Sequence, residues 1–326
     1  MRVLVTGASS MIGRATVARL VRRGDDVRVL QRHPAGLDVE QILGSITDHD
    51  AVATACDGVE GVIHLAAKVG VTGEWGDYEA INVQGTALLV DAARRAGVGR
   101  FVHVSSPSVA HAGQALVGAG PDPADPSSTR GHYATSKALA EVATLAASTD
   151  DMPIVAIRPH LVWGLGDTQL VGRIVERARQ GRLALVGSGA ALIDTTYVDN
   201  AADALVAALD RAPRLGGRAL VVSNGEPRTV AELVRRIVAA AAIDWTDRHV
   251  PTPLATGGGA IAERIWRRTG RTDDPPMTSF LAEQLSTAHW FDQRSTREAL
   301  DWEPSVSLAA GFERLADSYR SSSPSS

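Results

Sequence analysis

The sequence predicts an α/β fold: a mostly parallel, doubly wound sheet followed by a smaller C-terminal part. Three observations lead to this prediction. Short apolar runs alternate with amphipathic stretches through the first half of the 326 residues, as successive βαβ crossovers require. A glycine-containing turn, VTGASSMIG, joins the first strand to the first helix. After residue 160 the alternation becomes less regular, which indicates a separate substrate-facing part.

The first half contains five expected strands and four expected helices. The strands, recognised as buried apolar runs, are RVLVTG, VRVLQR, GVIHLAA, RFVHVSS and IVAIRP. The helices, recognised by apolar residues at helical spacing, cover residues 13–23, a segment around Val52 to Cys56, residues 80–96 and residues 133–148. Gly24 ends the first helix, as glycine commonly does.

In the second half the expected elements are more widely separated. GRIVERARQG and residues 230–242 are predicted helices, the latter opened by the capping box Thr229-x-x-Glu232. RALVVSNG is a predicted strand. Asp199 is expected to cap a helix, residues 252–259 to form a glycine-rich mobile loop, and IAERIWRR a short helix.

These elements suggest three regions. Residues 1–160 mainly form the nucleotide-binding body. Residues 161–318 mainly form the substrate-binding part, with some segments returning to the body. Residues 319–326, which end in SSSPSS, are expected to be a disordered tail.

The composition excludes several classes of protein. The chain is 44% hydrophobic and 21% charged, with a net charge of -4, so nothing indicates a nucleic-acid partner. Its single cysteine, Cys56, allows no internal disulfide and suits the cytoplasm. We expect no signal peptide and no membrane span, because no apolar run approaches the required length. No group of His, Cys, Asp and Glu has metal-ligand spacing, so no metal is expected.

The turn from Val5 to Gly13 has the context of a phosphate cradle. A glycine-containing turn between a first strand and a first helix lets backbone N–H groups face a pyrophosphate at the helix N-terminus. The turn has two glycines, Gly7 and Gly13, with Ser10 between them. A serine fits near a phosphate, and its hydroxyl is able to donate to a phosphate oxygen. An ordinary strand–helix loop remains the alternative.

The end of the second strand bears on the choice of cofactor. NAD-binding folds place an acidic residue here to bind the ribose hydroxyls. In this chain Gln31 occupies that position and Arg32 follows it. A guanidinium pairs well with a 2′-phosphate, so the sequence favours NADP(H) over NAD(H). A solvated surface arginine at position 32 remains the alternative.

A catalytic group is predicted from Tyr133-x-x-x-Lys137 and Ser106. Residues i and i+4 share one face of a helix. An ammonium near a phenol lowers the phenol pKa, which suits proton transfer to or from a carbinol oxygen. Ser106 follows a strand, at the sheet edge where α/β sites lie, and is expected to polarise a carbonyl.

Other residues carry weaker predictions. Candidate substrate residues are Ser108, His160, Trp163 and Asp167, all just beyond strand ends. Asn82 either bridges elements or caps a turn. His64 and His103 lie within apolar strands and are expected to be core histidines.

Several segments together resemble one family. TGASSMIG, HLAA, INVQGT, VSSPSV, YATSK, RPHLVWGLGD and TTYVDN follow the order found in extended short-chain dehydrogenase/reductases. The chain is most similar to the 3β-hydroxysteroid dehydrogenase-like branch, and within it to bacterial 2-alkyl-3-oxoalkanoate reductases. The segments RARQGRLALVG, DTTYVDNAA, VSNGEP and PPMTSFLAEQLSTAHWF carry that closer similarity.

The resemblance implies a Rossmann-type body, a C-terminal substrate domain and hydride transfer between a nicotinamide and a ketone or secondary alcohol. It implies that Tyr133 is the acid/base, that Lys137 is its partner and binds ribose, and that Ser106 is the carbonyl donor. The extended template TGxxGxxG aligns Ser10 with its middle glycine, and Ser45 stands where relatives place an aspartate. The expected cofactor-binding residues are Gly7, Ser9, Ser10, Met11, Ile12, Gly13, Arg32, Ser45, Ile46, Ala66, Ala67, Lys68, Asn82, Lys137, Pro159, Leu161 and Val162.

Three functions are compatible with these residues. The first is a ketone reductase or alcohol dehydrogenase that acts on an apolar β-keto acid or steroid-like small molecule. The second is a nucleotide-sugar epimerase or dehydratase, against which the missing acid near Gln31 argues. The third is a non-catalytic protein that senses NADP. By analogy with the fold, a homodimer is expected through the helices at 80–96 and 133–148.

Overall fold

The computed structural model describes residues 1–70, 73–110, 114–269, 275 and 277–322. Its centre is a seven-stranded parallel sheet in the order β12-β7-β5-β4-β1-β2-β3. The strands are β1 (Arg2–Thr6), β2 (Asp26–Gln31), β3 (Glu40–Leu43), β4 (Gly61–His64), β5 (Phe101–Val104), β7 (Ile154–Pro159) and β12 (Ala219–Val222). The α/β prediction with a doubly wound parallel sheet is confirmed. β3 is an edge strand that the sequence analysis did not predict.

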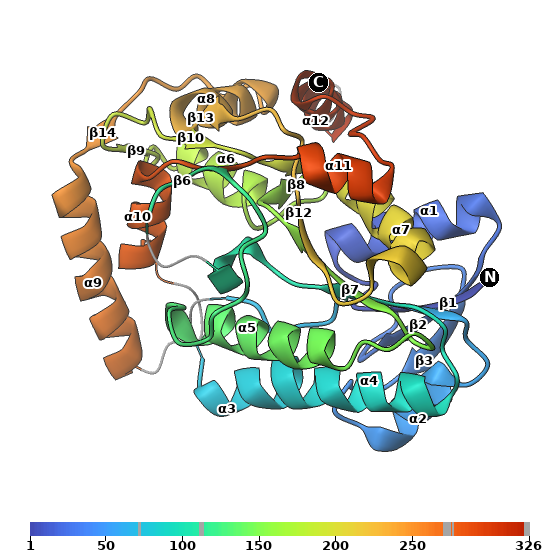
Figure 1. Cartoon of the computed structure of the whole chain (residues 1–326). Coiled ribbons are helices and arrows are strands. Elements are labelled where there is room, and N and C mark those ends of the chain that lie inside the picture. Colours follow the sequence, from blue (N-terminus) through green and yellow to red (C-terminus); the bar gives the residue numbers. More distant parts are fainter. Residues whose placement is uncertain (71–72, 111–113, 270–274, 276, 323–326) are drawn as a thin grey trace.

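Helices cover both faces of this sheet (Figure 1). One layer contains α1 (Met11–Arg23), α7 (Val198–Leu215) and α11 (Arg294–Leu300), and the other contains α2 (His49–Cys56), α4 (Thr86–Arg95) and α5 (Gly131–Ala146). The side chains of β1 alternate between the layers. Val3 and Val5 enter a core with Leu20 and residues of α7, whereas Leu4 enters a second core with residues of α2 and α4. Burial on both faces explains the continuous apolar run in the sequence.

A third core lies in the second half of the chain. It joins α6 (Val171–Arg179), α8 (Val230–Ala240) and α12 (Leu308–Ser322). Beside it lies a small sheet of β13 (Arg228–Thr229), β10 (Leu192–Ile193), β15 (His289–Phe291) and β6 (Leu116–Ala119). Two short parallel pairs are β8 (Val162–Trp163) with β11 (Thr196–Tyr197), and β14 (His249–Val250) with β9 (Leu185–Val186). α9 (Thr252–Thr269) and α10 (Ser279–Ser286) form the outer edge of this half (Figure 1).

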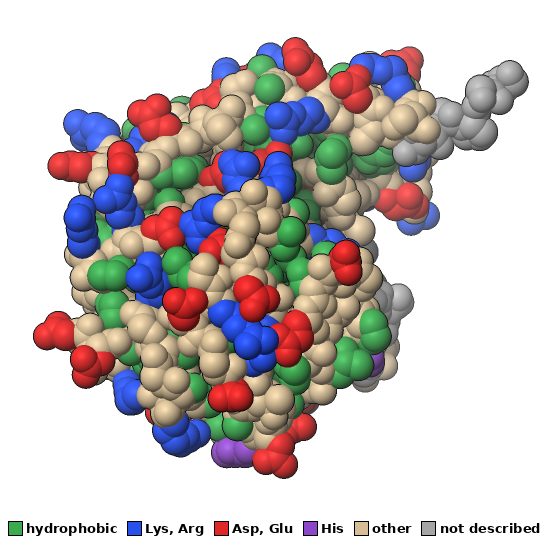
Figure 2. Space-filling model, turned by 90° about the vertical axis from the view of Figure 1, so that its right-hand side faces the viewer, with side chains coloured by type: hydrophobic (Ala, Val, Ile, Leu, Met, Phe, Trp, Pro, Cys, Tyr) green, Lys and Arg blue, Asp and Glu red, His purple; other side chains and the backbone are tan. Residues whose placement is uncertain are grey.

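The two halves are interleaved. α7, α11 and β12 come from the second half of the chain but pack on or extend the central sheet. The N-cap half of the predicted capping box forms, because the Thr229 hydroxyl accepts a hydrogen bond from the backbone N–H of Glu232 at 3.1 Å, whereas the Glu232 carboxylate bonds Arg236. On the face shown in Figure 2, acidic and basic side chains are interspersed. Across the described ranges, none of the helices has both the length and the apolar character needed to cross a bilayer.

Three local expectations differ from the structure. Residues 252–259 are not a loop but the first turns of α9. A Cβ on Gly259 would lie 2.5 Å from the backbone of Thr278, so this glycine permits close packing of α9 against the segment that begins α10, and packing overrides low helix propensity. Asp199 is the second residue of α7, whose N-cap is Tyr197. Residues 319–322 are helical, within α12, and 323–326 lie outside the described residues.

Candidate active site

In the turn after β1, backbone segments pack so closely that only glycine fits at two positions. Gly7 has φ +72, a left-handed conformation that favours glycine. A Cβ on Gly7 would lie 2.7 Å from the backbone nitrogen of Ala66, and one on Gly13 would lie 2.4 Å from the Gly7 oxygen. The turn leads into the N-terminus of α1 at Met11, and because Gly7 and Gly13 have no side chains, nothing at these two positions blocks the approach of a ligand to the backbone. This geometry fits a pyrophosphate at the start of α1.

Ser10 is the N-cap of α1. Its hydroxyl donates to the Gly7 carbonyl at 2.8 Å and accepts from the Gly13 N–H at 3.0 Å. The hydroxyl proton is therefore used inside the turn, and the serine stabilises the glycine turn and the helix start together. Met11 and Ile12 anchor the helix, since Ile12 packs against the first core and Met11 against the third.

The C-terminal end of β2, where NAD-binding folds bind the adenosine ribose, has no carboxylate. Gln31 is buried and bonds Gln41 at 2.9 Å, while Arg32 is exposed directly after the strand. Ser45 bonds the Thr47 hydroxyl at 2.8 Å. The adjacent Ile46 is buried, in contact range of Gly85. A cation, Arg32, thus follows the strand end at which NAD-binding folds place an acid.

Asn82 links the segment after β4 to the helix that carries Tyr133. It lies in a π-helical segment, η1 (Glu79–Gly85), between α3 (Trp75–Tyr78) and α4. Its amide accepts from the Lys68 N–H at 2.7 Å, and donates to the Lys68 carbonyl at 3.0 Å and to the Ser136 hydroxyl at 2.9 Å. Asn82 therefore bridges elements, which was one of the two sequence alternatives. The π-helix itself was not predicted; such segments are frequent at functional sites.

Tyr133 and Ser106 come together at the end of β5. Tyr133 lies in the first turn of α5 and is half-buried. Burial raises the pKa of Tyr133, and a hydrogen bond with Ser106 offsets part of that rise. Ser106 also bonds the hydroxyl of Ser108 at 2.9 Å. A protonated phenol beside a serine hydroxyl is able to donate a proton to a carbonyl oxygen.

The ammonium of Lys137 bonds the end of β5, which the Tyr133-x-x-x-Lys137 spacing did not predict. Its ammonium donates to the Val104 carbonyl at 2.6 Å and lies 3.5 Å from His103 Nε2. Burial lowers the pKa of Lys137 to about 8, and Glu141 opposes that shift. The expected lowering of the Tyr133 pKa by Lys137 is therefore not what the structure shows, because burial of the phenol dominates.

A buried ion pair joins α5, the helix of Tyr133 and Lys137, to the central sheet. Arg158 on β7 bonds Glu141 through both its Nε and Nη2 atoms, and both side chains are 1% exposed. Arg158 Nη1 also donates to the Asp122 carbonyl at 2.7 Å. Glu141 lies one turn after Lys137, so this pair fixes α5 against the end of β7. The sequence analysis did not identify Glu141. Its spacing of four residues from Lys137, which places both side chains on one face of the helix, was the pattern that could have indicated it.

The candidate substrate residues divide into packing and site residues. Trp163 is 1% exposed, stacks on Phe312 with ring centroids 4.5 Å apart and donates to Thr195, so it fills the third core. The Asp167 carboxylate accepts from the N–H groups that begin α6, including that of Val171 at 2.9 Å, so it acts as a helix cap.

His160 and its neighbours lie at the end of β7. The His160 ring is buried and contacts His289, with Nε2 3.1 Å from His289 Nδ1. Pro159 ends β7, and Val162 begins β8. Leu161 between them has φ +42, a strained conformation for a branched residue that is typical of functional sites. His64 and His103 are buried, as expected of core histidines, and burial lowers the pKa of both.

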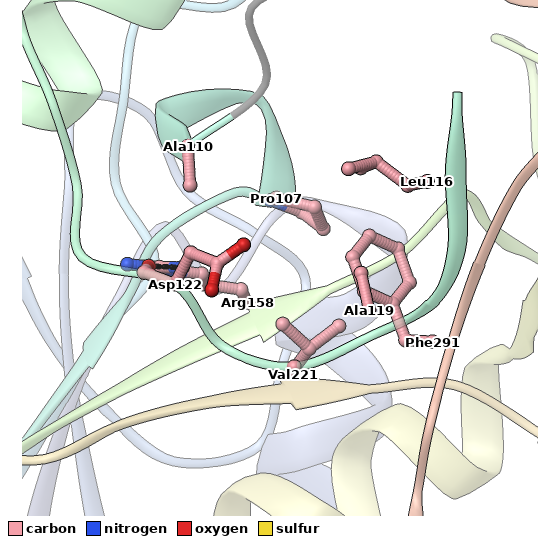
Figure 3. Close-up of a pocket in the computed structure, with 9 residues that line it drawn as sticks. Pro107, Ala110, Leu116, Ala119, Asp122, Arg158, Val221 and Phe291 are labelled. Carbon is pink, nitrogen blue, oxygen red and sulfur yellow. Dashed lines mark hydrogen bonds between the residues drawn. The ribbon is translucent and has the colours of Figure 1, made fainter. Parts of the chain in front are cut away.

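A small cavity lies behind the loop that carries Ser106 (Figure 3). Its lining is mostly apolar and comprises Pro107, Ala110, Leu116, Ala119, Gly120, Asp122, Arg158, Val221 and Phe291. Its volume is about 10 Å³, roughly that of one water-sized probe. As it stands, this cavity is a gap in the packing and is too small to hold a substrate.

Comparison with known proteins identifies the family of this chain. Residues 3–222 match the model of the NAD dependent epimerase/dehydratase family. The 2-alkyl-3-oxoalkanoate reductase of Stenotrophomonas maltophilia is 42% identical over 97% of this chain and 98% of its own. A 3 beta-hydroxysteroid dehydrogenase/Delta 5-->4-isomerase of Mycobacterium tuberculosis is 33% identical over 93% of this chain and 86% of its own.

Solved structures show the same fold. MoeE5, in complex with UDP-glucose and NAD, superposes with a TM-score of 0.76 over 99% of this chain and 100% of its own, at 23% identity. At that identity the likeness concerns the fold, so it does not favour a nucleotide-sugar substrate.

Proposed function

We propose that this chain, which belongs to the NAD dependent epimerase/dehydratase family, acts on an apolar β-keto acid. It is an NAD(P)-dependent oxidoreductase that interconverts a ketone and a secondary alcohol. The observation that carries the proposal is the placement of Tyr133 in the first turn of α5 and of Ser106 directly after β5, where Ser106 bonds Ser108 and lowers the pKa of the Tyr133 phenol against the effect of burial. The substrate class is supported by the 42% identical relative, which is named for 2-alkyl-3-oxoalkanoates. A steroid-like ketone is the second candidate, supported by the 33% identical dehydrogenase.

Each catalytic side chain has a separate task in this proposal. Ser106 donates a hydrogen bond to the substrate oxygen and orients it toward Tyr133. Tyr133, whose pKa is raised by burial, keeps its proton at neutral pH and delivers it to that oxygen as the alcohol forms. A tyrosine that stays protonated suits the reductive direction.

The turn at Gly7, Ser10 and Gly13 would hold the cofactor pyrophosphate, and Lys137 would bind its ribose. The bound nicotinamide supplies the hydride. Asn82 maintains the spacing between the segment after β4 and α5 through its bonds to Lys68 and Ser136.

The direct test measures NADPH-dependent reduction of a 2-alkyl-3-oxo acid and, in a parallel assay, of a steroid ketone. Absence of turnover with both would overturn the proposal.

Arg32 favours NADP(H), because it is exposed beside a β2 end without a carboxylate. Replacing it with Met is expected to lower the ratio of kcat/KM with NADPH to that with NADH about tenfold or more, the usual range for a charge-assisted hydrogen bond. Arg22→Met is the matched control, because Arg22 is exposed and lies at the C-terminal end of α1, away from the turn at Gly7. This variant should keep the ratio of kcat/KM with NADPH to that with NADH. An unchanged ratio in Arg32→Met would show that Arg32 is a solvated surface residue.

We also propose a cytoplasmic homodimer through α4 and α5, which lie side by side on one face (Figure 1). The outer surface of α5 carries small and apolar side chains, among them Val142, which is 46% exposed. Light scattering on the purified protein should give twice the chain mass of 34.2 kDa. Val142→Glu should then shift the mass toward that of the monomer, whereas a monomeric unmodified protein would contradict the proposal.

A further inference from the structure

We propose that Lys68 binds the carboxylate of the substrate, so that the site selects β-keto acids over neutral ketones. The inference rests on the proposed function and assigns a side chain to the acid group. In a β-keto acid the carboxylate lies two carbons from the ketone carbon. A cation that recognises it must therefore lie close to the residue that protonates the ketone oxygen.

The base of the Lys68 side chain is held in one position. Lys68 follows β4 in the segment HLAAK. The buried Asn82 binds both its backbone N–H and its carbonyl, at 2.7 Å and 3.0 Å. The same amide bonds Ser136 on α5, the helix of Tyr133. Lys68 is thus positioned relative to the catalytic helix.

Aromatic rings connect the Lys68 ammonium to the first turn of α5. The Nζ atom lies 5.2 Å from the centroid of the Tyr78 ring. That ring contacts His132, with centroids 6.0 Å apart, and His132 directly precedes Tyr133. The His132 ring also contacts Trp75, at 5.8 Å. The ammonium therefore lies over a ring packed against the start of the catalytic helix.

Lys68 is more available for a substrate than the buried cations nearby. Lys137 donates to the Val104 carbonyl, and Arg158 is paired with a buried Glu141. The Lys68 ammonium is paired with Asp77 at 3.1 Å, and the Asp77 side chain is 61% exposed. Such exposed pairs are weak in water. A substrate carboxylate is therefore able to replace Asp77 at little cost.

Arg130 is the strongest competing candidate. It immediately precedes α5 and forms an ion pair with Glu283 at 2.7 Å, with both side chains more than a third exposed. This pair joins the start of the catalytic helix to α10. Arg130 thus serves as the matched control, with the same charge and a similar pairing.

The test compares an acid with its own methyl ester. The full chain would oxidise a 2-alkyl-3-hydroxy acid and the corresponding ester with NADP⁺, so that the unstable β-keto acid is the product and not the substrate, and initial rates are read from NADPH formation. In Lys68→Gln the ratio of kcat/KM for acid to that for ester should fall about tenfold or more, as expected when a charged hydrogen bond is lost. Lys68→Arg should restore most of the ratio, and Asp77→Asn should lower the KM for the acid.

The inference fails if the ratio for acid to ester does not fall in Lys68→Gln. An equal loss for acid and ester would indicate a positional role for Lys68. A fall in the ratio in Arg130→Gln but not in Lys68→Gln would assign the carboxylate to Arg130. NADPH affinity, measured by fluorescence quenching in each variant, identifies any contribution of Lys68 to cofactor binding. If the unmodified protein oxidises neither compound, the proposed function fails; if it oxidises both and the ratio does not respond, only this inference fails.

Discussion

Tyr133→Phe is expected to lower turnover by about 10²–10⁴-fold, the usual contribution of a positioned general acid. The phenol is the group that pairs with Ser106 at the end of β5, and phenylalanine preserves its ring but removes the proton. NADPH affinity should be retained, since the turn at Gly7 is untouched. Steady-state kinetics with a ketone substrate, together with a direct binding titration, provide the measurement.

Tyr319→Phe in α12 is the control, because it removes a phenol remote from β5 and should leave turnover unchanged. If Tyr133→Phe kept full activity, another group would have to supply the proton and the assignment of Tyr133 would be wrong. A loss of NADPH binding in the same variant would instead indicate that the ring has a cofactor-binding role.

Glu141→Gln is expected to lower the free energy of unfolding by about 3–5 kcal/mol, because it leaves a buried guanidinium without its counter-charge. The Glu141–Arg158 pair is bidentate, and both side chains are 1% exposed. Urea unfolding followed by circular dichroism measures the change. The variant should also lower the pKa of Lys137 further, since Glu141 opposes the effect of burial on that ammonium.

The double variant Glu141→Gln/Arg158→Met should recover much of the lost stability, because it removes both buried charges. Asp247→Asn is the surface control. Its partner Arg235 is 55% exposed, and pairs of this kind contribute little. Equal losses in Glu141→Gln and Asp247→Asn would show that burial does not determine the strength of the 141–158 pair.

Local sequence patterns were sufficient to predict most of the body. Apolar runs identify parallel strands because both faces of the sheet are covered, as the alternation of Val3, Leu4 and Val5 between two cores illustrates. Thr229 caps α8 as predicted, because its hydroxyl bonds a backbone N–H only three positions away. For the same reason the sequence indicated the turn at Gly7 and placed Tyr133 and Lys137 on one helix.

Predictions that depended on long-range packing were less accurate. Residues 252–259 form a helix, because close contact with Thr278 compensates for poor helix propensity. Trp163 resembled a site residue beside a strand end, but its ring stacks on Phe312 from the last helix. Asp199 resembled a cap, yet α7 begins before it.

The sequence by itself determined the fold class and the family, and it predicted the candidate catalytic residues, since each depends on short spacings along the chain. Only the tertiary structure decided the environment of those residues. In the structure the Lys137 ammonium donates to the Val104 carbonyl, and the Ser10 hydroxyl bonds Gly7 and Gly13 within the turn after β1. The Lys68 ammonium lies over the Tyr78 ring. These contacts join residues that separate elements carry, and burial, which controls their pKa values, arises only when the elements pack.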